Sequence, residues 1–159
     1  MTTTLIHSLL YSTFFSIYVL GTLALVPRLW LRHYPAVEAK KQAPPTRRER
    51  GLHPLLGVFF VATLFVLPLL SAVVAKGADA SGSEIFWHMF ALGVMASAVD
   101  WLILDWVLVR WLQPRWLIPA DTDPASWRNR SDIIKDAVGF VIGSALAAVW
   151  GGIVSVVWF

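Results

Sequence analysis

The chain has 159 residues, of which 57% are hydrophobic, and a formal net charge of +3. Soluble domains are typically about 45–50% apolar, so this composition favours a membrane protein with a single domain. The absence of cysteine excludes disulfides, thiolate catalysis and cysteine-ligated zinc or iron–sulfur centres.

Four apolar segments predict four membrane-spanning helices, since about 20 helical residues cross a bilayer. The spans are predicted at residues 5–26, 54–75, 85–109 and 137–159. The first has no charge, lacks the basic leader of a signal peptide and ends before Pro27. In the second, Pro68 should kink the helix, because proline leaves one backbone carbonyl without its donor. Ser81 and Glu84 match a capping box and predict where the third helix begins.

The segments at 27–53 and 110–136 carry nearly all of the positive charge. The first holds seven Lys and Arg residues and the second holds five, which together make twelve of the thirteen in the chain. Cytoplasmic loops of membrane proteins carry such an excess, so both segments are predicted to be cytoplasmic and both termini to lie outside the cytoplasm. Three tryptophans in 110–136 indicate that this loop lies at the membrane interface.

These patterns predict an all-α fold, a four-helix antiparallel transmembrane bundle. Compact loops and the lack of cysteine are typical of a multi-pass protein of the bacterial inner membrane. The basic residues of 27–53 are either a topology signal alone or also a contact for anionic lipid at the cytoplasmic face. Because the positive charge lies beside the spans, lipid is the expected partner, and no nucleic-acid partner is expected.

The fourth span has a small residue at every fourth position. Small residues on one helix face allow another backbone to approach closely, which favours helix association in lipid. The stripe predicts either packing inside one bundle or the seam of a homodimer. Its members are Gly139, Gly143, Ala147, Gly151 and Ser155.

Two carboxylates interrupt the third span, at Asp100 and Asp105. A carboxylate at that depth costs about 2.5–3.5 kcal/mol on insertion scales and is therefore a candidate functional group. At 100° per residue the two lie about 140° apart on an α-helix, so they are not expected to form one paired site. Asp100 is expected to be protonated or to accept a hydrogen bond, for instance from Tyr18. Asp105 is expected to pair with Arg28, Arg50 or Lys135, or else to reach the headgroups with its side chain.

The first span carries a polar stripe that includes His7, Tyr11 and Tyr18. Such a stripe should face other helices, either for hydrogen bonding between helices or to line a cavity for a quinone, heme or substrate. His88 also lies near the outer side, whereas His33 and His53 lie at the inner edge, and two such layers would suit a diheme cytochrome. No metal-ligand spacing is present, so no metal site is predicted, and heme and quinone are the cofactor alternatives.

Three functional hypotheses remain open. The first is a non-enzymatic accessory or scaffold subunit that acts by helix association, with a second copy or another membrane protein as its partner. The second is a small proton- or cation-coupled transporter that uses Asp100, with Pro68 as a hinge. The third is a redox protein that binds heme or quinone at His7 and His88. No P-loop, GxGxxG or GxSxG motif is present, so no catalytic residue is predicted and an enzyme is not favoured.

Overall fold

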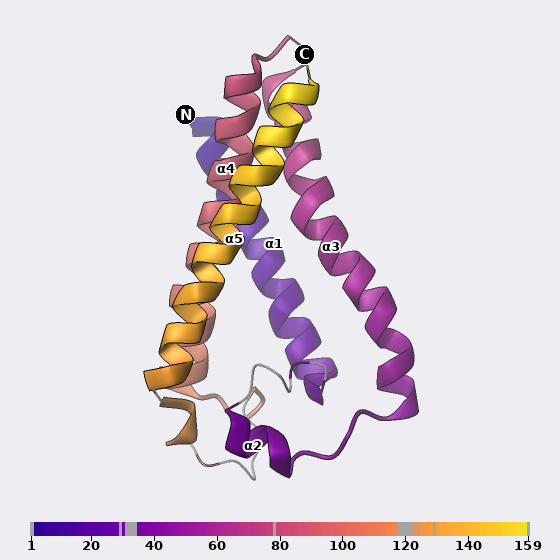
Figure 1. The fold of residues 1–159 in the computed structure, drawn as a ribbon, viewed down its shortest axis with the longest axis vertical. Coiled ribbons are helices and arrows are strands. Elements are labelled where there is room, and N and C mark those ends of the chain that lie inside the picture. Colours follow the sequence, from indigo (N-terminus) through magenta and orange to yellow (C-terminus); the bar gives the residue numbers. More distant parts are fainter. Residues whose placement is uncertain are drawn as a thin grey trace.

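The structure is a computed structural model that describes residues 2–28, 30, 35–77, 79–117, 123, 125–128 and 130–158, without the side chains of residues 36, 37, 41 and 130–133. These residues form helices and connections, with no strand among them. In chain order the helices are α1 (Thr2–Leu25), α2 (Ala36–Lys41), α3 (Arg47–Lys76), α4 (Gly82–Val99), η2 (Asp100–Leu112), η3 (Ser126–Arg128) and α5 (Arg130–Val157). The segment η2 continues α4 without a break, and the two together are called the third helix. The predicted all-α bundle of four antiparallel helices is confirmed (Figure 1).

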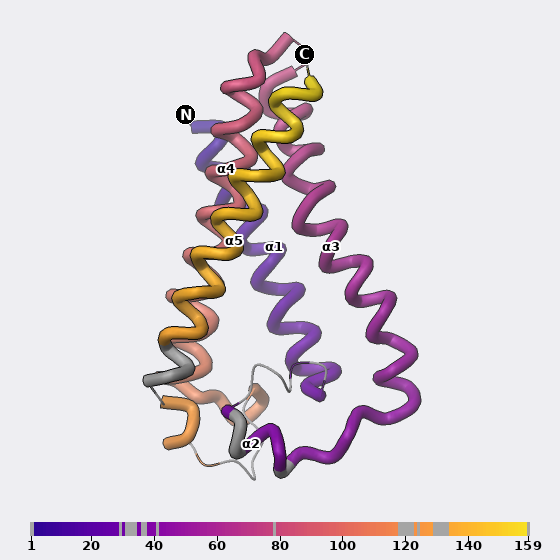
Figure 2. Tube along the Cα trace, viewed as in Figure 1, coloured from indigo at the N-terminus to yellow at the C-terminus, as the bar shows by residue number. Residues whose placement is uncertain are grey.

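Four helices are long and apolar enough to cross a bilayer. Each provides at least 24 such residues, and about 20 are sufficient. Both chain ends lie at one end of the bundle, called the termini end, and α2 lies at the opposite end, called the loop end (Figure 2). The long helices are Thr2–Leu25, Arg47–Lys76, Gly82–Leu112 and Ile134–Val157.

Two side-chain capping boxes fix where the second and third long helices begin. Thr46 Oγ1 accepts the backbone N–H of Glu49 at 3.3 Å, and the Glu49 carboxylate accepts that of Thr46 at 2.7 Å. The predicted box of Ser81 and Glu84 is present with the same pattern. Because the Thr46 box starts α3 at Arg47, the helix begins well before the span predicted to start at residue 54. A capping box satisfies backbone donors that the first helical turn leaves free.

The centre of the bundle is α4, which packs against α1, α3 and α5. Its residues Ile85, Met89 and Leu92 are at most 2% exposed. Towards the loop end, α3 diverges from the other helices (Figure 1). There the core consists of Phe15 and Val19 of α1 packed with Leu104 of the third helix. The bundle is therefore tight at the termini end and opens towards the loop end.

Pro68 lies buried inside α3, and neighbouring helices donate hydrogen bonds to carbonyls near it. Trp150 Nε1 of α5 donates to the Phe65 carbonyl at 2.9 Å, and the Tyr11 hydroxyl of α1 donates to the Thr63 carbonyl at 3.2 Å. The carbonyls that accept these bonds flank that of Leu64, the one that Pro68 leaves without its donor within the helix. These bonds attach the middle of α3 to α1 and α5.

The small-residue stripe of α5 lies partly against α4. A methyl group on Gly93 of α4 would overlap the methyl group of Ala147. One on Gly143 would lie 2.5 Å from Ser97 Oγ, and one on Gly151 would lie 3.4 Å from Phe86. Gly139 has open space around it, and the Ser155 hydroxyl donates to Gly152 within its own helix at 2.8 Å. Close approach of two backbones requires such small residues, so the middle of the stripe serves the α4–α5 contact.

Candidate functional site

The backbone of the third helix changes at Asp100. From Asp100 to Leu112 the turns are π-helical, with bonds between residues five apart, such as Gln113 N to the Leu108 carbonyl at 2.8 Å. In such turns residues five apart lie on one face, whereas an α-helix separates them by about 140°. Asp100 and Asp105 therefore share a face, and the prediction that they point apart is wrong. Helical segments of this kind frequently occur at functional sites.

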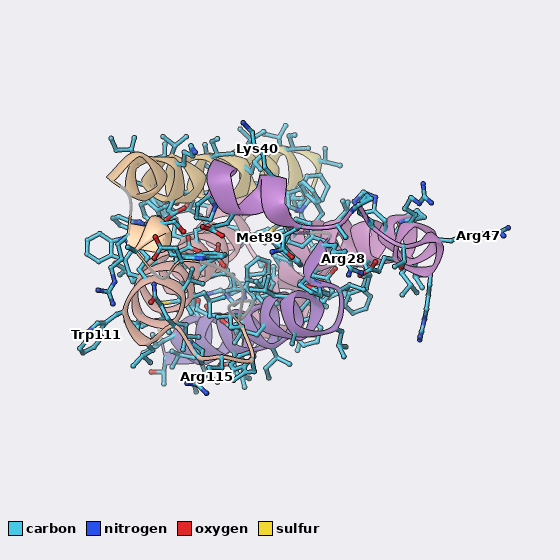
Figure 3. The ribbon with its side chains drawn as sticks, turned by 90° about the horizontal axis from the view of Figure 1, so that it is seen from below. Arg28, Lys40, Arg47, Met89, Trp111 and Arg115 are labelled. Carbon is cyan, nitrogen blue, oxygen red and sulfur yellow. The ribbon has the colours of Figure 1, made fainter. Side chains whose placement is uncertain are left out.

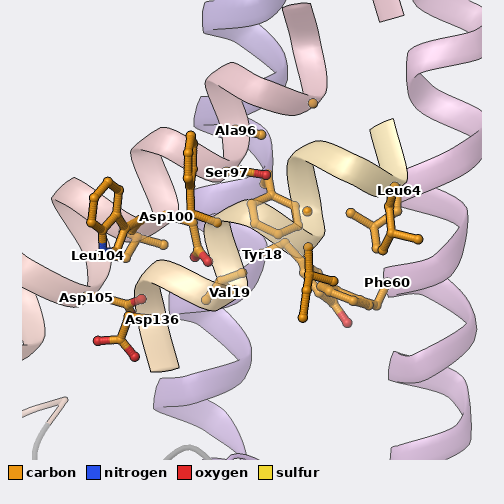
Figure 4. Close-up of a pocket in the computed structure, with 18 of the residues that line it drawn as sticks. Tyr18, Val19, Phe60, Leu64, Ala96, Ser97, Asp100, Leu104, Asp105 and Asp136 are labelled. Atoms are coloured by element: carbon orange, nitrogen blue, oxygen red, sulfur yellow. The ribbon is translucent and has the colours of Figure 1, made fainter. Parts of the chain in front are cut away.

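Both carboxyl groups line a cavity of about 620 Å³ inside the bundle. We call it the intrabundle cavity; α1, α3, the third helix and α5 all contribute to its wall. Figure 4 places Asp100, Asp105 and Asp136 on one side of it and Phe60 and Leu64 on the other. Its volume is in the range of about 300–1,000 Å³ that small-molecule sites occupy. The change in helical geometry therefore brings the two aspartates into the wall of one cavity.

Several residues chosen from the sequence lie in this wall and others do not. Tyr11 and Tyr18 line it together with the two aspartates, and so do Gly139, Gly143 and Ala147 of the small-residue stripe. His7, His88, Gly151 and Ser155 are not part of the wall. The structure therefore divides the proposed intramembrane polar site into an acidic cavity and a separate histidine cluster.

Neither Asp100 nor Asp105 has a hydrogen-bond or ion-pair partner within the part of the chain that the structure describes. The expected donor Tyr18 gives its hydroxyl hydrogen to the Leu56 carbonyl at 2.7 Å. Of the cations expected to pair with Asp105, Arg28 binds Glu49 instead, at 3.1 Å. The predicted protein partners of both carboxyl groups are therefore not found.

An ion pair that the sequence did not suggest lies in the wall of the cavity. Arg110 Nη2 binds the Asp136 carboxylate, and Arg110 Nη1 donates to the Trp127 carbonyl at 2.9 Å. Arg110 is 11% exposed and Asp136 is 23% exposed. Both residues were predicted to lie in a loop, but each belongs to a long helix. One usable signal was a regular spacing of charged residues: Asp105 follows Asp100 by five residues, and Arg110 follows Asp105 by five.

The charges in the cavity lie close enough to interact. Asp105 is subject to the electrostatic influence of Asp100, Asp136 and Arg110. Since Arg110 is bonded to Asp136, its charge is largely balanced by that carboxylate. The remaining pair of carboxyl groups at 100 and 105 therefore has to be compensated by something other than Arg110.

The second polar cluster joins three helices at the termini end. Ser71 Oγ of α3 lies 2.8 Å from both His7 Nδ1 and His88 Nε2, and Thr4 Oγ1 lies 3.1 Å from His88 Nδ1. The two rings are 5.5 Å apart, and His88 is 1% exposed. Both nitrogens of His88 thus have hydroxyl partners, and a hydroxyl that donates to one imidazole can accept from the other. His33 lies outside the described residues, and His53 is exposed on α3.

Replacing Ser71 by alanine should lower the free energy of unfolding by about 1–2 kcal/mol. The reason is that it removes a partner from two imidazole nitrogens at once, one of them fully buried. Single hydrogen bonds between membrane helices average about 0.6 kcal/mol, so the loss should exceed that of one bond. The measurement is unfolding of the protein in mixed detergent micelles, followed by circular dichroism.

A matched control is Ser16→Ala, because Ser16 donates only to the Ser12 carbonyl of its own helix, at 2.8 Å. We expect this change to alter stability by less than about 0.5 kcal/mol. Equal effects of the two substitutions would show that the histidine cluster does not hold the three helices together.

The chain matches no known protein family, no curated protein and no solved structure. No group of three or more His, Asp or Glu residues suited to a metal ion occurs among the residues described.

Proposed function

We propose that this chain is a small membrane transporter that exchanges a proton or a cation at Asp100 and Asp105. One observation supports the proposal: two carboxyl groups without a protein partner face a cavity inside an apolar helical bundle. A buried carboxylate is costly unless it is paired, so a proton, a cation or a ligand has to balance it. Ionisable groups at such depth commonly belong to ion or substrate pathways.

We place the protein in a bacterial inner membrane with both termini outside the cytoplasm. Both ends of the chain are at the termini end, and the exposed basic residues Lys40, Arg47 and Arg115 are at the loop end (Figure 3). This distribution agrees with the positive-inside rule if the loop end is cytoplasmic. The same residues would contact anionic lipid headgroups there.

An accessory or scaffold role is the second candidate, and the exposed apolar side of α3 favours it. Leu55 and Val58, near the loop end of α3, are 66% and 69% exposed. A helix of another membrane protein, or of a second copy, could pack on this side where α3 stands apart from the bundle. The redox alternative has less support, because both imidazole nitrogens of His88 already have hydroxyl partners, Thr4 and Ser71.

Ion flux into proteoliposomes tests the transporter against the scaffold. Vesicles loaded with a pH-sensitive dye receive outward gradients of Na⁺, K⁺ and a monovalent organic amine in turn. We expect at least one gradient to drive proton movement through the wild-type protein. Asp100→Asn should reduce the rate of proton movement to that of empty vesicles, because an amide cannot exchange a proton.

The control is Asp79→Asn, which changes an exposed carboxylate in the turn between α3 and α4. It should leave the rate unchanged. Wild-type vesicles that behave as empty vesicles under all three gradients would rule out the transporter. If the wild-type protein and Asp100→Asn then bind the same membrane-protein partner equally well, the scaffold role is favoured.

A further inference from the structure

We propose that the intrabundle cavity takes a lipophilic organic cation, a molecule with an apolar body and one positive charge, which reaches the cavity sideways from the lipid. This inference rests on the proposed exchange at Asp100 and Asp105 and names the substrate class of that site. A volume of about 620 Å³ is far larger than a proton or a bare metal ion requires and is ordinary for an organic ligand.

The wall of the cavity suits the apolar body of such a molecule. Phe15 and Phe60 lie on one side with ring centres 5.9 Å apart, and Trp101 and Phe140 stack on another at 5.3 Å. Aromatic faces attract organic cations, most strongly when water is excluded. Trp101 also has a buried indole N–H without a partner within the described part of the chain. The wall therefore offers apolar surface and an unused hydrogen-bond donor.

The charge of the cavity selects a cation over an anion. The other charged or titratable side chains that reach it near Asp100 and Asp105 are Tyr18 of α1, His53 of α3, Arg110 of the third helix, and Lys135 and Asp136 of α5. Arg110 is held by Asp136, and Lys135 has an interaction of its own. The two unpartnered carboxyl groups at mid-helix are therefore the dominant charges next to the aromatic wall.

Towards the loop end α3 leaves the bundle (Figure 1), and residues of both α3 and α5 belong to the cavity wall. Gly57 of α3 and Gly139 of α5 both belong to the wall, both are exposed, and neither has any atom within 4 Å of the place where a side chain would begin. No side chain covers the cavity wall at these two positions, which leaves a gap there. A molecule with an apolar body would partition into lipid first and enter through this gap.

Binding of tetraphenylphosphonium and of tetraphenylborate to the full-length protein in lipid nanodiscs tests the inference. The two ions have nearly the same size and shape but opposite charge. We expect saturable binding of tetraphenylphosphonium with one ion per protein, and no comparable binding of tetraphenylborate. The affinity for the cation should increase as the pH rises, because protons and the cation compete for the same carboxyl groups.

Three variants sharpen the test, with circular dichroism and gel filtration as checks of folding. Asp100→Asn and Asp105→Asn should each weaken tetraphenylphosphonium binding at least about tenfold. Gly57→Trp should weaken it as well, because a side chain can begin at this position without a clash and the indole would then occupy the gap. Gly152→Trp is the control, since Gly152 also has open space but lies outside the cavity wall.

Equal binding of both ions, or unchanged binding in the two asparagine variants, would overturn the inference. If tetraphenylphosphonium does not bind but Na⁺ or K⁺ still drives an Asp100-dependent proton flux, the organic-cation inference fails and the proposed function stands. If flux and binding are both absent, both proposals fail.

Discussion

Replacing Arg110 by leucine should lower the free energy of unfolding by about 3 kcal/mol, since removing one partner of a buried ion pair leaves the other charge uncompensated. Arg110 is 11% exposed and donates both to the Asp136 carboxylate and to the Trp127 carbonyl. It therefore links the third helix to α5 and to η3 with one side chain. Unfolding in mixed detergent micelles, followed by circular dichroism, measures the change.

A double-mutant cycle separates the pair from its surroundings. Asp136→Leu alone should also be destabilising, whereas Arg110→Leu combined with Asp136→Leu should be milder than the sum, because no orphaned charge remains. Arg115→Leu is the control, because Arg115 is exposed at the same end of the bundle and a surface change is usually within about 0.5 kcal/mol. Additive losses in the cycle would contradict an energetic link between Arg110 and Asp136.

The helices were predictable because their signals are local. Apolar runs of sufficient length define the four long helices. The Ser81–Glu84 box marks the start of the third one in the sequence as it does in the structure. The start of α3 at Arg47 was missed although Thr46 and Glu49 form the same kind of box. Charges at 47, 48 and 50 made this stretch resemble a loop, and a helix can extend beyond the bilayer with such residues.

The cavity was only partly predictable because it depends on a change of helical geometry. Asp100 and Asp105 stood out as charges in an apolar run, but an α-helical wheel separates them. The segment from Asp100 to Leu112 contains neither glycine nor proline, so no residue in it signals wide turns. The role of Arg110 followed from the same change, because its position relative to the aspartates depends on those turns. Side-chain partners across helices, such as Tyr18 with the Leu56 carbonyl, require knowledge of the packing.

The ion pair of Arg110 with Asp136 is a reason why the carboxyl groups of Asp100 and Asp105 have no partner among the residues that the structure describes. If Arg110 were free to reach Asp105, the cavity would contain its own counter-charge and would have less need of a ligand. Because Asp136 and the Trp127 carbonyl hold the guanidinium at the loop end, the carboxyl groups nearer the middle of the bundle stay accessible. Asp136→Leu should therefore affect the proposed cation binding as well as stability, since it releases Arg110 towards Asp105.

Replacing Gly93 by leucine should lower the free energy of unfolding by about 3 kcal/mol, the upper range for inserting a side chain into a packed interface. Even a methyl group at Gly93 would overlap that of Ala147, so the larger side chain would force α4 and α5 apart. Both helices line the intrabundle cavity on either side of this contact. We therefore expect cation binding to fall together with stability, with both measured on the same nanodisc sample.

A reciprocal exchange of side chains identifies the cause of that loss. Gly93→Ala should be destabilising on its own, and adding Ala147→Gly should recover most of the stability, because the methyl group then moves from one helix to the other. Gly152→Leu, on the same helix as Ala147 but with open space around it, should be neutral or slightly stabilising, since leucine is the better helix former. If Ala147→Gly failed to rescue Gly93→Ala, the close approach of α4 and α5 would not be what holds the cavity wall in place.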